Sequence, residues 1–369
     1  MLADRSSDSG VALRAGSTPI DTVVVGLHLR WLGVWQRPNH IISRLATRFE
    51  VLVIEEPRAA ASDRNRHERL DGLSLIVPER RTPSEAVDDA TIADLRASIE
   101  DRHPAFWLYT PMMLRLVEAA PRAPLIYDKM DELAAFAGAD PRMRDREQEL
   151  LGRASVVFAG GRSLWESVRE RARSGGPFPS GVDAAHFVAQ QPERAVAQTA
   201  GARFGYVGVL DERIDFDLIA RLSRARPDAT IELVGPVAKI DPASLPLARN
   251  IRYYGACSYA ELPRILARFD VALMPFARNA ATRFISPTKT LEYLAAGKPV
   301  VSTAVPDVVA HYADVVSIAR GASAFVDAVA RAERPNEARR ALGIERARRN
   351  SWDTIVAGML AACARANVL

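Results

Sequence analysis

Short apolar runs alternate with amphipathic segments along the first half of the chain. The runs are rich in Val, Ile, Leu and Phe and predict buried strands. They cover residues 22–26, 51–54, 73–77, 105–109, 124–127 and 155–159. Residues 39–49 and 141–153, which lie between them, have the apolar spacing of helices. This alternation is typical of a parallel sheet with helices on its faces.

The same alternation starts again after a polar stretch at residues 190–201, which reads as a linker. Strands are predicted at 203–208, 230–234, 271–274 and 299–302, and helices at 217–225, 259–268, 287–296 and 352–366. The fold class is therefore α/β, with two Rossmann-like doubly wound domains facing each other across a cleft. We expect a flexible arm (1–19), an N-terminal domain (20–195), a C-terminal domain (196–350) and a closing helix (351–369).

Composition narrows the class of protein. The 369 residues are 48% hydrophobic and 25% charged, as in globular proteins, which excludes disorder for most of the chain. The net charge of +4 is spread without the dense basic runs of a nucleic-acid binder, so no nucleic-acid partner is expected. Two cysteines cannot build a disulfide framework or a structural zinc site.

The sequence also bears on where the protein is expected. The chain contains no stretch of about 18 uncharged apolar residues, so no transmembrane helix is expected. The first residues are small and polar and lack the apolar core of a signal peptide. We therefore expect a cytoplasmic protein. The mild positive charge is compatible with peripheral contact with the anionic surface of the inner membrane.

The segment 284–301 carries the clearest candidate chemistry. Ligands of open α/β sheets bind at the carboxyl ends of the strands, and here a helix is predicted to start at Ser286-Pro287. Free backbone N–H groups, the Thr288 hydroxyl and the Lys289 ammonium would form an anion site suited to a diphosphate. Glu292, one turn later, could accept hydrogen bonds from two ribose hydroxyls. An ordinary capped helix with solvated Lys289 and Glu292 explains the same residues.

The run from Ser286 through Glu292 to Gly297-Lys-Pro resembles the signature of GT-B glycosyltransferases, particularly glycosyltransferase family 4. The resemblance implies that the helix start holds the diphosphate of a nucleotide sugar and that Glu292 binds its ribose. It implies no cofactor, and a UDP-sugar is slightly favoured as the substrate. The family's Glu-x7-Glu motif would place a Glu at position 284, where this chain has Phe284. The identity of the sugar and the stereochemical outcome therefore stay open.

Other segments of the C-terminal half resemble the same family. In 204–215, Gly208 would let the backbone approach the phosphates and Arg213 could pair with them. In 234–239, Lys239 would reach the diphosphate. In 250–256, a strand end would cradle the base. The donor-binding candidates are thus Gly208, Arg213, Lys239, Tyr254, Gly255, Ala256, Ser286, Thr288, Lys289 and Glu292. Each segment also fits an ordinary strand and turn.

The loop after the first strand offers acceptor-binding candidates. Trp35 presents a flat apolar face for a sugar ring, and Gln36 and Arg37 offer hydrogen-bond donors. The run Trp35-Gln-Arg-Pro-Asn-His40 resembles one in bacterial glycosyltransferases of exopolysaccharide or teichuronic-acid assembly. The alternative is a Trp packed in the seam between domains.

Two acidic residues follow the strand at 124–127. Asp131 is the preferred base for an acceptor hydroxyl because it lies further past the strand end, and Asp128 is the alternative. Both residues would equally suit a helix N-cap. Asp215 and Asp217 match an Asp-x-Asp metal motif but fit a helix start better, so no metal site is expected.

The combined expectation is a metal-independent glycosyltransferase. Its N-terminal domain would bind the acceptor, a lipid-linked or glycan precursor of the cell envelope or of an exopolysaccharide, and its C-terminal domain would bind the nucleotide-sugar donor. The absence of Gly-x-Gly-x-x-Gly and P-loop motifs argues against a dinucleotide dehydrogenase and a P-loop enzyme. A non-hydrolysing nucleotide-sugar epimerase and a catalytically inactive sugar-nucleotide-binding subunit remain alternatives.

Overall fold

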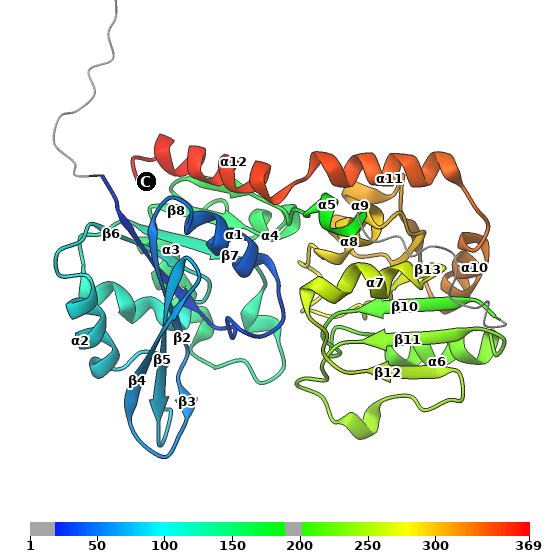
Figure 1. Ribbon diagram of the computed structural model, residues 1–369, viewed down its shortest axis with the longest axis horizontal. Helices are drawn as coiled ribbons and strands as arrows, with labels where there is room; N and C mark the ends of the chain where they lie inside the picture. The colour runs from blue at the N-terminus through cyan, green and yellow to red at the C-terminus, as the bar shows by residue number, and fades with distance from the viewer. Residues whose placement is uncertain (1–18, 189–200) are drawn as a thin grey trace, which may run out of the picture.

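The computed structural model describes residues 19–188 and 201–369, which form two α/β domains side by side (Figure 1). The sheet of the N-terminal domain has the order β3-β5-β2-β1-β6-β7-β8-β9, and all neighbours on this path pair in parallel. Its strands are β1 (Thr22–Leu27), β2 (Glu50–Glu55), β3 (Arg58–Ala59), β5 (Leu73–Arg80), β6 (Pro104–Leu108), β7 (Leu125–Lys129), β8 (Val156–Ala159) and β9 (Gly175–Pro177). β4 (Arg64–Leu70) pairs antiparallel with β5.

Helices cover both faces of this sheet, which is why β1 is buried along its whole length. One face packs against α1 (Arg37–Leu45) and the C-terminal helix. The other packs against α2 (Asp89–Ser98), α3 (Met143–Arg153) and the 3-10 helix η1 (Pro111–Ala119). The short elements α4 (Arg162–Glu166) and η2 (Leu133–Ala135) follow strands β8 and β7 at the edge of the sheet that faces the second domain.

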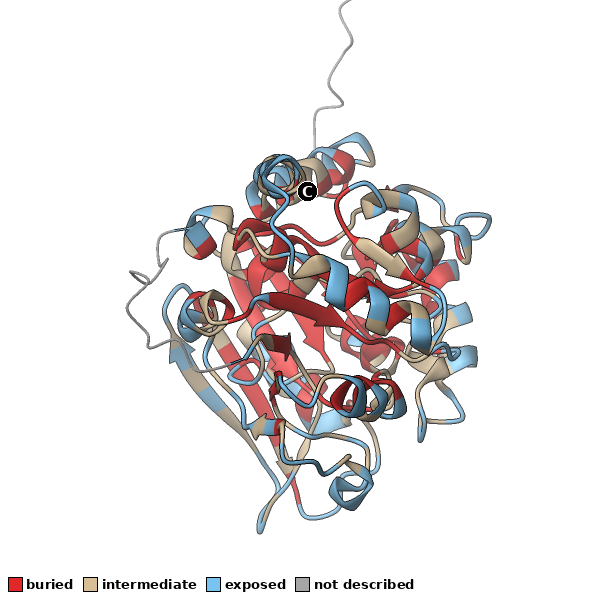
Figure 2. Ribbon diagram, turned by 90° about the vertical axis from the view of Figure 1, so that its right-hand side faces the viewer, coloured by how far each residue is buried: buried red, intermediate tan, exposed pale blue. Residues whose placement is uncertain are grey.

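The C-terminal domain has a six-stranded parallel sheet with helices on both faces, and the strands form its buried centre (Figure 2). The strand order is β12 (Ile251–Tyr254), β11 (Thr230–Val234), β10 (Arg203–Val207), β13 (Val271–Met274), β14 (Val300–Thr303) and β15 (Ser317–Ala319). The helices are α5 (Ala184–Val188), α6 (Phe216–Ala225), α7 (Leu262–Ala267), α8 (Lys289–Ala295), α9 (Pro306–Tyr312), α10 (Ala322–Ala332) and α11 (Glu337–Arg349), with the 3-10 turns η3 (Pro242–Ser244) and η4 (Tyr259–Glu261).

The chain crosses between the domains twice. Val182 and Phe187 already belong to the core of the C-terminal domain, so the described chain enters that domain before the boundary that the sequence predicts at 195/196. After α11 the chain returns, and α12 (Trp352–Arg365) packs on the N-terminal domain (Figure 1). Trp352 is fully buried and stacks on His40 of α1, with ring centroids 4.6 Å apart.

Each predicted strand and helix is present in the structure, with small shifts at the ends. The sequence missed β4, because its residues are almost all polar and give no apolar signal. The side chains of β4 alternate between partly buried and exposed positions, as expected for a strand that covers β5 at the edge of the sheet.

A buried ion pair joins three parts of the N-terminal domain beneath the cleft. The guanidinium of Arg37, at the start of α1, donates to Asp128 Oδ1 of β7 from Nη2 at 2.9 Å and from Nε at 3.2 Å. Its Nη1 donates to the carbonyl of Phe178 at 2.6 Å. The two side chains are only 3% and 0% exposed. Because a buried charge is costly without its partner, this pair holds α1 against β7.

We predict that Asp128→Asn lowers the free energy of unfolding by about 3 kcal/mol, because it leaves the Arg37 charge buried without a counter-charge. Urea unfolding measures the change. Asp89→Asn, which makes the same replacement at an exposed pair with Arg115, should change the stability little. Equal effects of the two variants would show that the Arg37–Asp128 pair does not hold the domain together.

Candidate active site

A cleft of about 1160 Å³, continuous with solvent, lies between the two domains. The N-terminal side of its lining comes from the loop after β1 and from the loop after β7. The C-terminal side comes from the loop after β10 and from the turn and first residues of α8. The sequence-predicted residues in the lining are Trp35, Gln36, Arg37, Asp131, Gly208, Arg213, Ser286, Thr288, Lys289 and Glu292. The carboxyl edges of both sheets thus meet at one site, as the fold class predicts.

Two charged residues from the start of α8, Lys289 and Glu292, line the cleft. The Lys289 ammonium lies 5.3 Å from the ring centroid of Tyr206 and 5.2 Å from that of Phe276, and its Nζ has no hydrogen-bond partner among the described residues. Burial, followed by the neighbouring charge of Arg213, lowers the pKa of Lys289. Burial raises the pKa of Glu292, and the charge of Lys289 partly offsets that rise. Both groups are thus held in a poorly solvated place without a direct ion pair.

Gly208 leaves room beside Lys289. Its φ of +139° favours glycine, and a Cβ built there would lie 3.1 Å from Lys289 Cε. Gly235, which the sequence analysis did not single out, has a φ of +145° and packs so closely that a Cβ would lie 2.0 Å from the Gly208 carbonyl oxygen. The turns after β10 and β11 therefore approach each other backbone to backbone and leave the cleft open at this point.

Arg213 is fixed by a neighbour that the sequence analysis also missed. Its Nη2 donates to Asp211 Oδ2 at 2.6 Å, and its Nε donates to both oxygens of that buried carboxylate at 3.0 Å. The guanidinium also lies over the ring of Phe136 in the N-terminal domain, 5.5 Å from the centroid. Arg213 therefore has a defined position at the junction of the two domains.

Asp131 faces these cations from the other side of the cleft. Its side chain is partly exposed and has no hydrogen-bond or ion-pair partner among residues 19–188 and 201–369. Burial raises the pKa of Asp131, and the positive charge of Arg213 opposes that rise. Asp131 is thus an available carboxylate rather than the cap of a helix.

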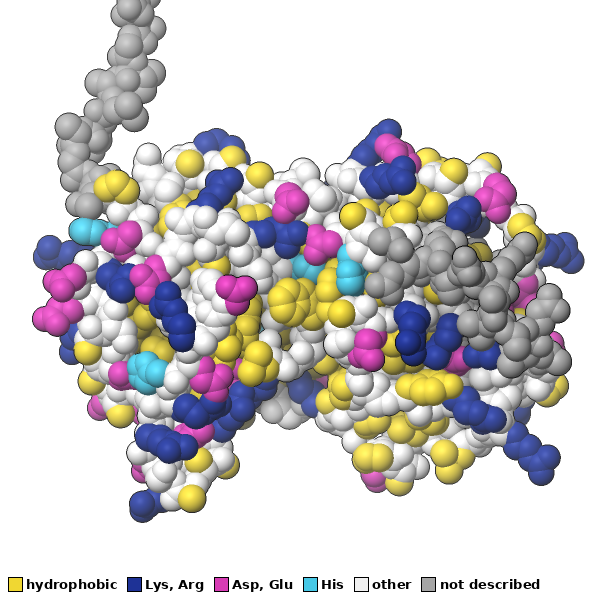
Figure 3. Space-filling model, in the orientation of Figure 1, with side chains coloured by type: hydrophobic (Ala, Val, Ile, Leu, Met, Phe, Trp, Pro, Cys, Tyr) yellow, Lys and Arg dark blue, Asp and Glu magenta, His cyan; other side chains and the backbone are white. Residues whose placement is uncertain are grey.

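Trp35 lies both in the cleft and in the seam between domains. Its ring is 38% exposed and packs 6.0 Å from the ring of Tyr259, which belongs to the C-terminal domain. Tyr259 in turn stacks on His186 at 4.4 Å. Hydrophobic and histidine side chains gather at the junction of the two domains on the face drawn in Figure 3. Tyr259 was missed because nothing in its local sequence marks a residue that crosses a domain boundary.

Two of the residues predicted for the site in the N-terminal domain, Asp128 and Arg37, bind each other. Asp128, the alternative base, is fully buried in β7 and bound to Arg37, so no substrate can reach it. Arg37 lines the cleft, and three of the five N–H groups of its guanidinium donate to Asp128 and Phe178, so its role as an acceptor-binding donor stays a prediction. Gln36 precedes α1 as its N-cap, and its backbone N–H donates to Asn39 Oδ1 at 3.0 Å.

Four predicted donor-binding residues lie outside the lining of the cleft: Lys239, Tyr254, Gly255 and Ala256. Lys239 adopts a left-handed φ of +60°, and its ammonium lies 4.6 Å from the ring centroid of Phe136, facing a second cavity. Tyr254 is 41% exposed and lies beneath Arg268. Phe284, at the position of the usual Glu, is also outside the lining and lies beneath the Arg283 guanidinium.

No group of three or more His, Cys, Asp or Glu side chains in the described ranges could hold a metal ion. In the same part of the chain, every helix is too short or too polar to cross a membrane.

The comparisons with known proteins match this geometry. Residues 201–333 match the family model described as Glycosyl transferases group 1. The putative teichuronic acid biosynthesis glycosyltransferase TuaH of Bacillus subtilis (strain 168) is 29% identical over 174 residues. That match spans 44% of this chain and 44% of the relative, so less than half of the relative's length is covered.

Two solved structures cover nearly the whole chain. Sucrose-phosphate synthase from Thermosynechococcus elongatus has a TM-score of 0.72 at 14% identity, over 92% of this chain and 97% of that chain. Anabaena HepE, in complex with UDP and glucose, has a TM-score of 0.69 at 12% identity, over 94% of this chain and 100% of that chain. The chain therefore has the GT-B fold, and its C-terminal domain is similar to the group 1 glycosyltransferases.

Proposed function

We propose that the protein transfers a sugar from a nucleoside diphosphate sugar, with UDP favoured, to a glycan or lipid-linked precursor of the cell envelope or an exopolysaccharide. The observation that carries the proposal is the meeting of Lys289, Glu292, Gly208 and Arg213 in one cleft opposite Asp131. The UDP and glucose in the HepE structure and the teichuronic-acid role named for TuaH support these substrate classes. A lipid-linked acceptor would bring the protein to the inner membrane surface.

Each donor residue has a chemical task in this proposal. The Lys289 ammonium lies near the rings of Tyr206 and Phe276, has no hydrogen-bond or ion-pair partner among the described residues, and offers its charge to the diphosphate. Arg213, held by Asp211, adds a second cation at the same side of the cleft. Gly208 leaves room for phosphate oxygens, and Glu292 accepts hydrogen bonds from the ribose. These groups stabilise the nucleoside diphosphate as it leaves, without reorganising during the reaction.

We predict a maximum in the pH dependence of UDP affinity. Below its lowered pKa, Lys289 is charged and attracts the diphosphate, so affinity falls as the pH rises through that pKa. Above its raised pKa, Glu292 is a carboxylate, so its bonds to the ribose weaken as the pH falls through that pKa. Isothermal titration calorimetry at a series of pH values should therefore show that UDP affinity falls on both the acidic and the alkaline side of a maximum.

Substitutions show which residue causes the loss of UDP affinity at each end of the pH range. Lys289→Met should weaken UDP binding roughly tenfold and remove the alkaline fall, and Glu292→Gln should weaken it similarly and remove the acidic fall. Lys239→Met, which removes an ammonium outside the cleft, should leave UDP affinity unchanged. Wild-type affinity in both cleft variants would refute the assignment of the donor site.

We also predict that transfer needs no divalent cation, because Lys289 and Arg213 supply positive charge where a metal ion would otherwise act. Turnover should be the same with excess EDTA and with added Mg²⁺ or Mn²⁺. Loss of turnover in EDTA that either ion restores would contradict this mechanism.

Asp131 is proposed to take the proton of the acceptor hydroxyl. As the new bond from the acceptor oxygen to the sugar carbon forms, the bond from that carbon to the diphosphate oxygen breaks, and the proton passes to the carboxylate. The raised pKa of Asp131 makes its carboxylate a stronger base than an exposed aspartate.

Asp131→Asn should therefore retain UDP affinity and lose about a hundredfold or more in transfer rate. Mass spectrometry detects transfer as an acceptor whose mass has increased by one sugar residue. The same readout separates a transferase from an epimerase. Asp145→Asn, on the exposed side of α3, is the matched control. A normal transfer rate in the Asp131→Asn enzyme would remove Asp131 from the mechanism.

A further inference from the structure

A second cavity lies beside the cleft, at the carboxyl edge of the N-terminal sheet. Its polar lining comes from the residues after five strands of that sheet and from Lys239 of the C-terminal domain. These groups are His28 after β1, Glu56 after β2, Glu85 after β5, Thr110 after β6, and Asp140 with Arg142 after β7. The loop after β7 borders both spaces, because Asp131 lines the cleft, and Leu133 and residues 136–140 line the cavity.

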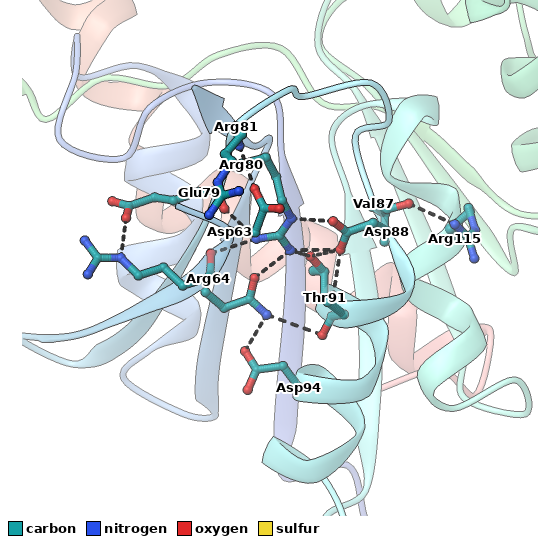
Figure 4. A network of polar contacts seen from close by, with 12 residues as sticks. Asp63, Arg64, Glu79, Arg80, Arg81, Val87, Asp88, Thr91, Asp94 and Arg115 are labelled. Carbon is teal, nitrogen blue, oxygen red and sulfur yellow. Dashed lines mark hydrogen bonds and ion pairs between the residues drawn. The ribbon is translucent and has the colours of Figure 1, made fainter. Parts of the chain in front are cut away.

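The walls of this second cavity are held in place by paired charges. Arg80, at the end of β5, donates to Asp88 Oδ1 and Thr91 Oγ1 at 2.8 and 2.9 Å and to the Arg64 carbonyl at 2.7 Å (Figure 4). This network fixes both ends of the segment 81–88, which contributes one wall. On the rim, Arg142 donates to Glu85 Oε1 at 2.7 Å and to Asp140 Oδ2 at 2.9 Å.

The loop after β7 forms another wall of the second cavity, and it is bound to the C-terminal domain. The backbone N–H of Ala137 donates to the Glu212 carboxylate at 2.9 Å. The neighbouring ring of Phe136 lies between the cations of Arg213 and Lys239. The second cavity is therefore formed before any ligand arrives, as binding sites for small molecules usually are.

Glu56 is the exception among the carboxylates of this cavity. Glu85 and Asp140 are occupied by Arg142, whereas the Glu56 carboxylate has no hydrogen-bond or ion-pair partner among the described residues. His28 and Glu56 follow the neighbouring strands β1 and β2, whose last residues Leu27 and Glu55 are paired in parallel register, and both line the second cavity. The Nδ1 atom of His28 is buried and has no hydrogen-bond partner within residues 19–188 and 201–369. Unsatisfied polar groups at a cavity wall are groups that a ligand can satisfy.

The charges of the second cavity disfavour a phosphate. The guanidinium of Arg142 is used by two carboxylates, so Lys239 is the one lining cation without an ion pair in the described chain. Burial lowers the pKa of His28 to about 4, so its ring is neutral at pH 7. Burial raises the pKa of Glu56, and the positive charges of Arg30 and Lys239 oppose that rise. As a carboxylate without an ion pair in the described chain, Glu56 repels an anion and accepts hydrogen bonds from hydroxyl groups. The apolar side chains of Met112, Leu133 and Met143 offer a surface for the C–H face of a sugar ring.

We propose that the second cavity binds the accepting end of the acceptor as a neutral, unphosphorylated saccharide, with Glu56 accepting hydrogen bonds from its hydroxyl groups and His28 lining the same cavity. This inference rests on the proposed function, because it takes the bound saccharide to be the acceptor of that reaction, held at the loop that also carries Asp131. It adds the chemical class of the acceptor's terminal sugar and identifies two specificity-determining residues.

The test pairs neutral sugars with their phosphates. Protein saturated with UDP is titrated with the methyl glycosides of glucose, mannose and N-acetylglucosamine and with the 6-phosphate of each sugar, and ligand-observed NMR reports the dissociation constants. We expect at least one neutral glycoside to bind more tightly than its phosphate. Glu56→Gln should weaken that binding at least tenfold, with UDP affinity and Tm unchanged.

Glu118→Gln, the same replacement at an exposed ion pair of the N-terminal domain, should bind the glycoside as the wild type does. Tighter binding of a 6-phosphate than of its neutral partner would overturn the inference, and so would unchanged binding in Glu56→Gln. With UDP binding intact, no response to any neutral glycoside would also overturn it. A failure of UDP itself to bind would instead reject the proposed function, and the inference with it.

Discussion

The site depends on a seam of aromatic side chains that sets how the two domains face each other. Trp352 of α12 is fully buried in the N-terminal domain and stacks on His40, and His40 lies 5.2 Å from Tyr259 of the C-terminal domain. Trp35 packs on the same tyrosine. Because aromatic pairs bury a large area in defined geometry, these contacts place the carboxyl edges of the two sheets opposite each other. The cleft exists only with the edges in that position, and Lys239 of the C-terminal domain lines the second cavity from across the same junction.

Charged side chains near the cleft fall into two groups with different consequences. Arg37 with Asp128, Arg213 with Asp211, and Arg80 with Asp88 are paired, and these pairs hold elements in place. Lys289, Asp131 and Glu56 lack such partners in the described chain and line either the cleft or the second cavity. Leaving a partly buried charge without a partner destabilises the protein, so the unpaired groups are the candidates for contacts with substrate.

Sequence patterns could predict most of the long buried strands and helix α8, because apolar runs and the Ser-Pro-Thr-Lys segment are local signals. They missed β4 and the short strands β3, β9 and β15. They also placed Asp131 beyond its strand, where the structure has it. Local signals could not show that Asp128 is buried against Arg37, because that pair joins residues far apart in the chain. Lys239 was expected beside the diphosphate, but its left-handed turn directs it to the second cavity. Tyr259, Asp211 and Glu56 acquire their places only through tertiary packing.

Arg213 connects the two halves of the proposed reaction. It lines the cleft where we place the donor diphosphate, and its guanidinium covers Phe136, which lines the second cavity where we place the acceptor. Asp131 begins the same loop that carries Phe136, and the charge of Arg213 opposes the rise in the pKa of this carboxyl group. A diphosphate bound to Arg213 would neutralise part of that positive charge and so favour protonation of Asp131. Donor binding would in this way make Asp131 a better proton acceptor at the moment when the acceptor hydroxyl must lose its proton.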